Sequence, residues 1–353
     1  MTLILNNEEI TQVLTMDICM EVLEEAFQEQ AAGRVINQLR YDVNMPLPSR
    51  SERQARYEFK TMVGVIPKLG VAALRMSSIL YHRPVRDGLE KVEHLTIAPG
   101  NGTVGLVQLY STETGELLSF MPDKVIDGMR VGGTFGLACK YLARKNACVL
   151  GLLGSGWQAR FQLLAISHVR ALKLVKVYSP NPVHCKKFAE DFKGKLGVEI
   201  VAVKNVEEVA NGADILIAAT NARSPIIHEE MISPGMYVAA VQNEISSDAL
   251  RKADRIVVFS SKHPLVYEGG GDQYGRLVSN RSSLDYDKCP LLEQIIARTT
   301  QGRIRDDEIT MFRSGSGMGV QFAAVAAKVY ELAREQGLGH EIPTQWFTQT
   351  SLS

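Results

Sequence analysis

The sequence predicts an α/β protein that combines a Rossmann-type, doubly wound parallel sheet with a discontinuous α+β domain. Three observations predict this fold class. Between residues of about 145 and 312, short apolar runs alternate with helical segments, as in a parallel sheet covered on both faces. The first run leads directly into the motif GSGWQA and then into a helical segment. A last helical segment, 322–337, follows this region, and we expect it to return to the first domain.

The alternating segments give the order of the nucleotide-binding domain. The expected strands are ACVLGLL, LVKVYS, VEIVAV, DILIAAT, MYVAAV and RIVVFSS. The expected helices between them are WQARFQLLAISHV, PVHCKKFAEDFKGKL and the short VEEVANG. We therefore expect a Rossmann domain at 126–314 and a second, discontinuous domain at 1–125 and 315–353.

The first domain has a different pattern. Apolar residues on one face of segment 17–32 predict an amphipathic helix. From 40 to 110, short apolar runs separated by Gly, Pro and Asn predict an antiparallel or mixed sheet, and 111–117 predicts a hairpin turn. Segment 123–144 reads as a helix with four glycines, which indicates close approach by another backbone or a ligand.

Composition excludes several classes of partner. The chain of 353 residues has 39 basic and 39 acidic side chains, which gives no support for nucleic acid or an anionic membrane as the main partner. No apolar run approaches the roughly 20 residues of a membrane span, and the start lacks the pattern of a signal peptide. Five scattered cysteines favour reduced thiols in a cytoplasmic protein. Seven dispersed histidines lack ligand spacing, so we expect no metal site.

The motif GSGWQA predicts a dinucleotide site. Gly154 permits the tight turn, Gly156 lets a diphosphate approach the backbone, and Ala159 lets the helix pack closely on the sheet. Free N–H groups and the helix dipole would hold the phosphates. Ser155, Trp157 and Gln158 complete the candidate cofactor residues of this turn. The alternative is a tight strand-to-helix turn that binds no ligand.

The end of the second strand, VYSPNP, favours NADP over NAD. No acid stands where an NAD-binding fold usually holds the ribose 2′-hydroxyl. Ser179, Asn181 and Lys186 are the candidate residues for a 2′-phosphate, although Lys186 alone reads more simply as a solvated helix residue.

A later strand end supplies two further candidates. Thr220 and Asn221 follow DILIAA, at the carboxyl edge of the sheet where ligands of open α/β folds bind. They are candidate neighbours of the nicotinamide or its ribose. A polar strand-end turn without a ligand is the alternative.

The chain resembles the ornithine cyclodeaminase and mu-crystallin family over nearly its whole length. The motifs that carry the resemblance are STETGEL, DGMRVGGTFGLACKYLAR, VLGLLGSGWQAR, GADILIAAT, ISPGMYVAAV and DDEITMFRSGS. The resemblance implies a homodimer, in which 1–125 and 315–353 form the substrate-binding and dimerisation domain. It implies that 126–314 is the NAD(P)-binding domain and that the nicotinamide cofactor is held between the two domains. It also implies hydride transfer between the cofactor and an amino-acid-like carbon, with an imine as the oxidised partner.

Residues of the substrate site follow from the same resemblance. Arg40 and Arg130 match two arginines that bind the substrate carboxylate, and a guanidinium can hold both carboxylate oxygens. Glu58 matches an acidic position beside the substrate. Without the resemblance, a surface ion pair would be the favoured role of each arginine.

Two departures from the family concern the reacting centre. A lysine expected early in LGVAALRM is replaced by alanine, at Ala72 or Ala73, and Arg75 or Lys60 is the candidate substitute. Arg75 would share one strand face with Ala73. At the position of an acid/base aspartate stands Glu244, whose side chain is one methylene longer, and Asn243 is an alternative partner for the substrate amine.

These residues favour NAD(P)H-dependent reduction of an imino acid, cyclic or linear, to an amino acid, or the reverse reaction. Such chemistry needs a carboxylate clamp, a proton donor or acceptor near nitrogen, and a positioned nicotinamide. Two alternatives remain: an ornithine or lysine cyclodeaminase that recycles NAD, and a non-catalytic NADPH-binding or ligand-binding protein like mu-crystallin.

Overall fold

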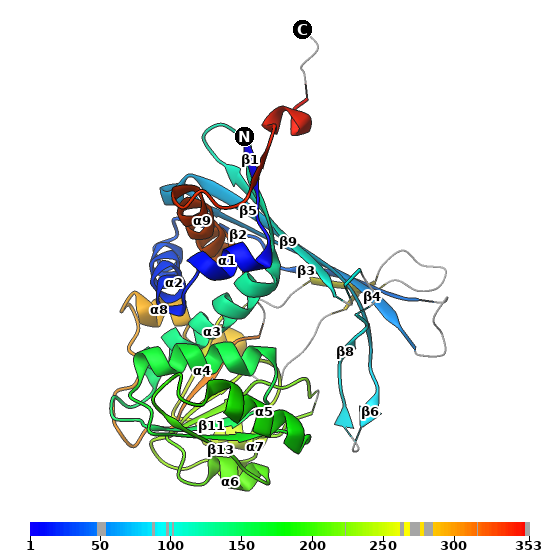
Figure 1. Ribbon diagram of the computed structural model, residues 1–353. Coiled ribbons are helices and arrows are strands. Elements are labelled where there is room, and N and C mark those ends of the chain that lie inside the picture. The colour runs from blue at the N-terminus through cyan, green and yellow to red at the C-terminus, as the bar shows by residue number, and fades with distance from the viewer. Residues whose placement is uncertain are drawn as a thin grey trace.

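In the computed structural model, two sheets are linked by one long helix (Figure 1). The structure describes residues 1–47, 54–86, 89–96, 99–100, 102–222, 224–261, 265–268, 276–278, 285–315 and 317–349. The helices are α1 (Asn7–Val13), α2 (Met16–Ala31), α3 (Asp123–Leu142), α4 (Trp157–Val169), α5 (Pro182–Phe192), α6 (Val206–Ala210), α7 (Ser247–Arg251), α8 (Leu292–Ile296) and α9 (Gly319–Glu335).

The sheet of the first domain is mixed. Its strands are β1 (Thr2–Ile4), β2 (Ile36–Asn37), β3 (Tyr41–Pro46), β4 (Arg56–Ile66), β5 (Val71–His82), β8 (Glu93–His94), β9 (Val104–Ser111), β10 (Leu117–Pro122), β17 (Leu265–Glu268), β18 (Arg276–Val278) and β20 (His340–Ile342). Their order is β18-β17-β3-β4-β5-β9-β10-β1-β20, with β2 beside β4 and β8 beside β5. A separate ribbon pairs β6 (Val85–Arg86) with β7 (Leu89–Glu90). The expected hairpin turn joins β9 and β10, and this prediction is confirmed.

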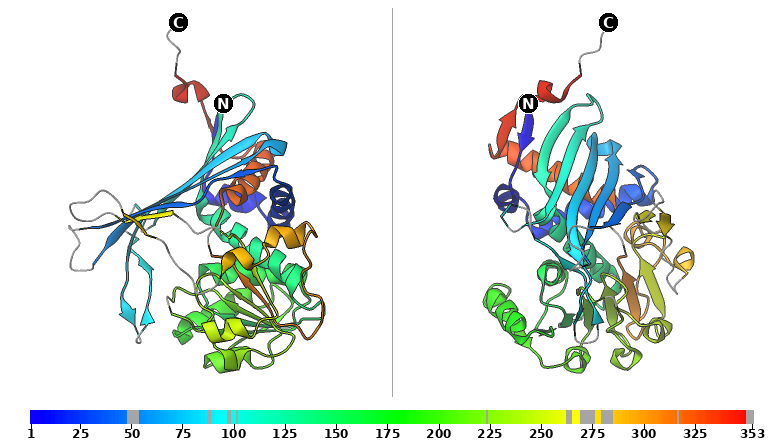
Figure 2. Two further views of the ribbon diagram at one scale, coloured as in Figure 1. Left: turned by 180° about the vertical axis from the view of Figure 1, so that it is seen from behind. Right: turned by 90° about the vertical axis from the view of Figure 1, so that its right-hand side faces the viewer.

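Alternation along these strands divides the sheet into two faces. Every second residue of β5, starting at Val71, is buried, because helix α9 packs on that face of the sheet (Figure 1). Helix and sheet are in backbone contact where α9 crosses β4. An alanine Cβ at Gly64 or at Gly319 would collide with the backbone of the other element. Among the described residues, no helix covers the opposite face, which is seen in the right-hand view of Figure 2.

The second sheet is parallel throughout and confirms the predicted Rossmann class. Its strands are β11 (Val149–Leu153), β12 (Leu174–Tyr178), β13 (Glu199–Ala202), β14 (Ile215–Ala218), β15 (Tyr237–Ala240), β16 (Arg255–Val258) and β19 (Thr310–Arg313). The order is β13-β12-β11-β14-β15-β19-β16, and each neighbouring pair is parallel. β19 was not among the strands expected from the sequence.

The segment after β16 departs from the expected domain boundaries. Residues 265–268 and 276–278 lie within the range expected for the nucleotide-binding domain, but β17 pairs with β3 in the first sheet. The open edge of β3 accepts this strand in parallel register, with Val266 opposite Asp42. After β16 the chain therefore leaves the second sheet, adds β17 and β18 to the first sheet, and returns to the second sheet at β19.

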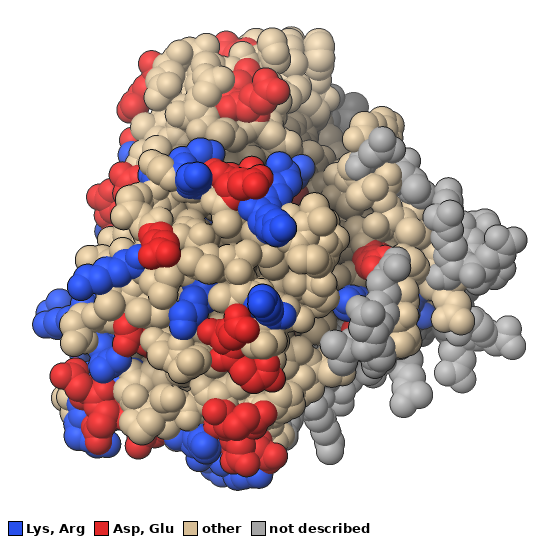
Figure 3. Space-filling model, turned by 60° about the horizontal axis from the view of Figure 1, so that its bottom comes forward, with Lys and Arg blue, Asp and Glu red and all other residues tan. Residues whose placement is uncertain are grey.

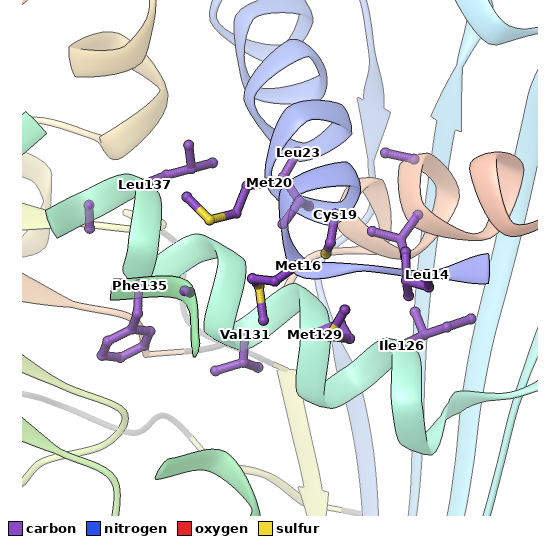
Figure 4. Packing of buried hydrophobic residues seen from close by; sticks show 14 of the residues in the cluster. Leu14, Met16, Cys19, Met20, Leu23, Ile126, Met129, Val131, Phe135 and Leu137 are labelled. Carbon is purple, nitrogen blue, oxygen red and sulfur yellow. The ribbon is translucent and has the colours of Figure 1, made fainter. Parts of the chain in front are cut away.

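Helix α3 connects the two sheets, and its glycines explain how. An alanine Cβ at Gly132 would lie 2.6 Å from the carbonyl oxygen of Phe161, and one at Gly136 would lie 2.8 Å from the Cβ of Ala165. Both contacts are with α4, so this helix packs directly against the backbone of α3. Gly133, on another face, lies near Leu23 of α2, which packs on α3 as Figure 4 shows. The small residues accommodate neighbouring helices.

No helix in the described part of the chain is long and apolar enough to cross a membrane.

Candidate active site

The turn between β11 and α4 has the geometry that its glycines predict. Gly154 has φ +107°, a conformation that L side chains rarely adopt, and a Cβ there would collide with the carbonyl of Ala219 on the neighbouring strand end. Its N–H donates to the carbonyl oxygen of Tyr178 at 2.8 Å. Gly154 is therefore needed for the fold of the turn itself.

Gly156 has a different reason to be glycine. It is the N-cap residue of α4, and no side chain caps that helix. A Cβ at Gly156 would meet no atom within 4 Å, so the space in front of the first turn of the helix is open. Uncapped N–H groups facing open space at a helix N-terminus fit the diphosphate of a dinucleotide. The residues present here therefore fit the expected cofactor.

This contrast gives a prediction for two alanine variants. Gly156→Ala should leave the melting temperature of the protein unchanged, because its methyl group meets nothing, but should raise the dissociation constant for NADPH about tenfold or more by occupying the phosphate space. Gly154→Ala should lower the melting temperature through its φ and its collision with Ala219. Unchanged NADPH binding by Gly156→Ala would exclude a diphosphate at this turn.

The end of β12 carries the candidates for cofactor selectivity. Asn181 caps α5, because its Oδ1 accepts from the N–H of Val183 at 3.0 Å. The carbonyl oxygen of Ser179 accepts a weak bond from the thiol of Cys185. Lys186 is exposed on the first half of α5. The residues from 179 to 186 include no acid that would repel a 2′-phosphate.

The carboxyl ends of β14 and β15 are joined through Glu244. Its carboxyl group is fully buried and accepts from the N–H of Gln242 at 2.5 Å and from the N–H and hydroxyl of Thr220 at 3.2 and 3.1 Å. Burial raises the pKa of Glu244 to about 7, although these donors lower it. The bonds of this side chain fix the loop that carries Thr220, a candidate neighbour of the nicotinamide.

The raised pKa of Glu244 makes stability depend on pH. The folded protein binds this proton more tightly than the unfolded chain, in which the carboxyl has a pKa near 4.5. The free energy of unfolding should therefore fall as the pH rises from about 4.5 to about 7. In Glu244→Gln, the free energy of unfolding should fall less between these pH values. Urea unfolding of both proteins at pH 5 and pH 8 measures the difference. The same pH dependence in both proteins would contradict the burial of this group.

Asn221 and Asn243 are engaged elsewhere. The amide nitrogen of Asn221 donates to the carbonyl oxygen of Val92 at 3.2 Å, so a segment of the first domain contacts the edge of the second sheet. Asn243 is exposed and bonds to Arg313 at the end of β19. These bonds tie both side chains to protein partners at the sheet edge.

The inner face of the first sheet carries a row of charges. In the strand register, Asp42 of β3 is opposite Lys60 of β4, and Lys60 is opposite Ser77 of β5. Lys60 and Glu58 form an ion pair at 2.6 Å. Asp42 Oδ1 and Ser77 Oγ are buried and have no hydrogen-bond partner among the residues that the structure describes. Such unpaired groups, on both sides of an ammonium, are available to a polar ligand.

Arg40 belongs to the same row. It precedes β3, and its Nη2 lies 2.7 Å from Asp42 Oδ2, so the two side chains share a face two residues apart. The ion pair holds the guanidinium at the edge of the row formed by Asp42 and Lys60.

Helix α3 brings two more ion pairs to this face. Arg75 of β5 pairs with Asp123, at the start of α3, at 2.6 Å. Further along α3, Arg130 pairs with Asp127 at 2.6 Å. Both guanidiniums lie against the ring of Phe322, at 5.3 Å for Arg75 and 4.9 Å for Arg130. One aromatic side chain of α9 therefore supports two buried arginines.

The structure thus places Arg40, Glu58, Lys60, Arg75 and Arg130 toward the inner face of the first sheet. It also adds residues that were not expected: the acids Asp42, Asp123 and Asp127, and Gln321 and Phe322 of α9. Asp127 had a signal, because it lies one helical turn before Arg130. Glu244 and Asn243, in contrast, are bonded to residues of the second sheet.

The family follows from a comparison with known proteins. Residues 1–337 match the Ornithine cyclodeaminase/mu-crystallin family. The chain belongs to this family. A relative, Delta(1)-pyrroline-2-carboxylate reductase of Bacillus cereus, is 32% identical over 326 residues, which are 87% of this chain and 98% of that protein.

Solved structures agree with the fold. One is the Delta(1)-pyrroline-2-carboxylate reductase of Thermococcus litoralis in complex with NADH and L-proline, with a TM-score of 0.78, 27% identity and coverage of 97% of this chain and 100% of that chain. Another is an archaeal alanine dehydrogenase dimer with bound NAD, with a TM-score of 0.74, 27% identity and coverage of 97% and 99%.

Proposed function

We propose that this protein is an NAD(P)H-dependent oxidoreductase that reduces a C=N bond beside a carboxylate, converting an imino acid to an amino acid, or runs the reverse reaction. One observation carries the proposal: α3, which bears Arg130, packs against α4, which begins at the open glycine turn. A group held by Arg130 and a cofactor held by the turn are thus presented by two helices in contact. The relatives that reduce pyrroline-carboxylate or oxidise alanine support the same chemistry.

The residues of the charged face divide the work. Arg130 and Arg40 bind the substrate carboxylate, because each has a planar fork of donors. Lys60 donates a proton to the imine nitrogen, and Glu58, at 2.6 Å, orients its ammonium. Asp42 Oδ1 and Ser77 Oγ accept N–H groups of the substrate. The bound nicotinamide supplies the hydride.

Arg75 has a supporting role in this proposal. It lies on the buried face of β5, as does Ala73. The family resemblance would place a lysine early in this strand, where the chain has Ala72 and Ala73. Its pairing with Asp123 neutralises it, so it adds a fixed donor and no net charge.

A substrate panel tests the reaction. Delta(1)-pyrroline-2-carboxylate, its six-membered homologue, iminosuccinate, and pyruvate with ammonia are each mixed with NADPH or NADH, and absorbance of the reduced cofactor is followed. Stoichiometric oxidation with at least one compound is the expected result. Ammonia release from ornithine or lysine without net cofactor change would establish a cyclodeaminase instead. Tight NADPH binding without turnover of any compound would establish a binding protein.

The cofactor proposed is NADP, with NAD as the alternative. The absence of an acid between 179 and 186 and the exposed Lys186 on α5 support it. We expect a higher kcat/KM with NADPH than with NADH. An equal or higher value with NADH would decide for NAD.

We also propose a homodimer, formed through the helix-free face of the first sheet (Figure 2, right). This face carries apolar side chains on adjacent strands, namely Val43, Phe59, Val63, Leu74, Met76, Leu106 and Phe120. A contiguous apolar surface of this kind is typical of a protein interface. Light scattering should give twice the mass of the chain.

Two further aspects concern the surroundings of the protein. Acidic and basic side chains are intermixed on the face shown in Figure 3, which suits a small-molecule enzyme better than a nucleic-acid-binding protein. The five cysteines are all free thiols, which favours a reducing compartment such as the cytoplasm.

A further inference from the structure

One carboxylate contacts both the proposed carboxylate-binding arginine and the cofactor turn. Arg130 donates through Nη2 and Nε to Asp127 Oδ1, at 2.6 and 3.2 Å. The other oxygen of the same group, Oδ2, accepts from Gln158 Nε2 at 3.4 Å. Gln158 is the second residue of α4 and lies inside the GSGWQA turn. Asp127 therefore bridges two elements with different proposed ligands.

Two further contacts of Arg130 come from α9. Its Nη1 donates to Gln321 Oε1 at 3.1 Å, and its guanidinium lies against the ring of Phe322. Gln321 in turn donates to Thr134 on α3 at 2.7 Å, so it cannot follow the arginine freely. In the described part of the chain, the hydrogen bonds of Asp127 link the guanidinium of Arg130 to α4.

Asp127 stays ionised in this setting. Burial alone would raise the pKa of its carboxyl, but Arg130 and Arg75 outweigh that effect and lower the pKa below its usual value. A charged acceptor at neutral pH makes its hydrogen bonds to Arg130 and to Gln158 stronger than neutral ones.

Gln158 has an unmatched group of its own. Its Oε1 is buried and has no hydrogen-bond partner in the described ranges of the chain. A buried acceptor without a donor is costly, so a donor on a ligand in the turn would change the position that this amide prefers. Because Nε2 of the same amide donates to Asp127, a shift of the amide would also shift the Asp127 carboxylate.

We propose that Asp127 is a positioning residue that couples the cofactor turn to Arg130, so that the imino acid binds more tightly once the cofactor is bound. The substrate side of this coupling rests on the function proposed above. By linkage, the imino acid also strengthens cofactor binding by the same factor. The preferred order of binding is then cofactor first.

A double-mutant cycle of Asp127→Asn and Gln158→Ala tests the coupling. At saturating NADPH, Gln158→Ala should raise the KM for Delta(1)-pyrroline-2-carboxylate about fivefold, with a smaller change in kcat, although Gln158 is not bonded to Arg130. In the Asp127→Asn background the same change should have little further effect, as expected within one hydrogen-bond network. An unchanged KM in Gln158→Ala, or effects that multiply, would overturn the proposal.

The matched control uses a different acid, Asp191, which pairs with an arginine of α4. Asp191 lies 2.6 Å from Arg160, so Asp191→Asn makes the same chemical change and should combine independently with Gln158→Ala. Thermal melts check folding, and if Asp127→Asn does not fold, the KM of Gln158→Ala alone decides.

Binding provides a readout that needs no turnover. If the native protein reduces none of the imino acids, the proposed function fails, and the cycle is repeated on the NADPH dissociation constant from cofactor fluorescence. Effects of the two substitutions that are non-additive by about threefold or more support the Asp127–Gln158 pair. Additive effects overturn it.

Discussion

Arg130→Ala should raise the KM for the imino acid at least about tenfold, because a hydrogen bond to a charged group contributes about 1.5–3 kcal/mol and about 1.4 kcal/mol corresponds to a factor of ten. The structure gives a reason to expect more than the loss of one bond. Arg130 is 7% exposed, and its removal takes the charged donor from Asp127 Oδ1 and one of the two donors from Gln321 Oε1. Steady-state kinetics at saturating NADPH measures the effect.

Arg130→Lys is the matched control for charge. Lysine keeps the positive charge but loses the planar fork that can hold two carboxylate oxygens, so its KM should lie between those of the native protein and Arg130→Ala. Melting temperatures separate binding from stability, because an acid that loses its partner in a buried site also destabilises the fold. An unchanged KM in Arg130→Ala would remove this residue from the substrate site.

The Rossmann half was predictable because its signals are local. Strands buried on both faces are apolar along their length, and a turn that needs φ +107° requires glycine at 154. β19 escaped prediction because its position between β15 and β16 depends on tertiary packing. The pairing of β17 with β3 likewise joins segments more than 200 residues apart, and no local pattern encodes it.

The candidate site was predictable only in part, for a similar reason. Alternation along one strand placed Arg75 beside Ala73 on the inner face, and the structure has both buried there. The support from Gln321 could not be inferred, because it lies 191 residues from Arg130 in the chain. The family resemblance predicted an acid/base role for Glu244. Its burial could not be predicted, because it depends on the contact between the ends of β14 and β15.

Charge pairing was the main feature that residue-by-residue matching overlooked. Arg40, Lys60, Arg75 and Arg130 each have an acid within 2.6–2.7 Å, contributed by β3, β4 or α3. In each pair, the attraction between the two charges offsets part of the cost of removing them from water. A substrate carboxylate must share or replace an acid at one of them, which makes affinity depend on those acids as well as on the arginines.

Gly132→Ala should destabilise the protein and weaken both ligands, while Gly133→Ala should be tolerated. A Cβ at Gly132 would lie 2.6 Å from the carbonyl oxygen of Phe161, and backbone cannot move aside without separating α3 from α4. Overpacking of this kind costs about 1–3 kcal/mol, more than the roughly 1 kcal/mol that alanine gains over glycine in a helix. A Cβ at Gly133 would lie 2.9 Å from Leu23 Cδ1, the end of a flexible side chain.

The adjacent pair tests the central geometric argument. Both substitutions add one methyl group to the same helix and gain the same helix propensity, so they differ only in what the methyl group meets. Urea unfolding should show Gly132→Ala less stable than Gly133→Ala. Because α4 carries the glycine turn and α3 carries Arg130, the KM for the imino acid and the dissociation constant for NADPH should both rise in Gly132→Ala. If the two variants are equally stable and equally active, close packing of these helices does not set the distance between the two ligands.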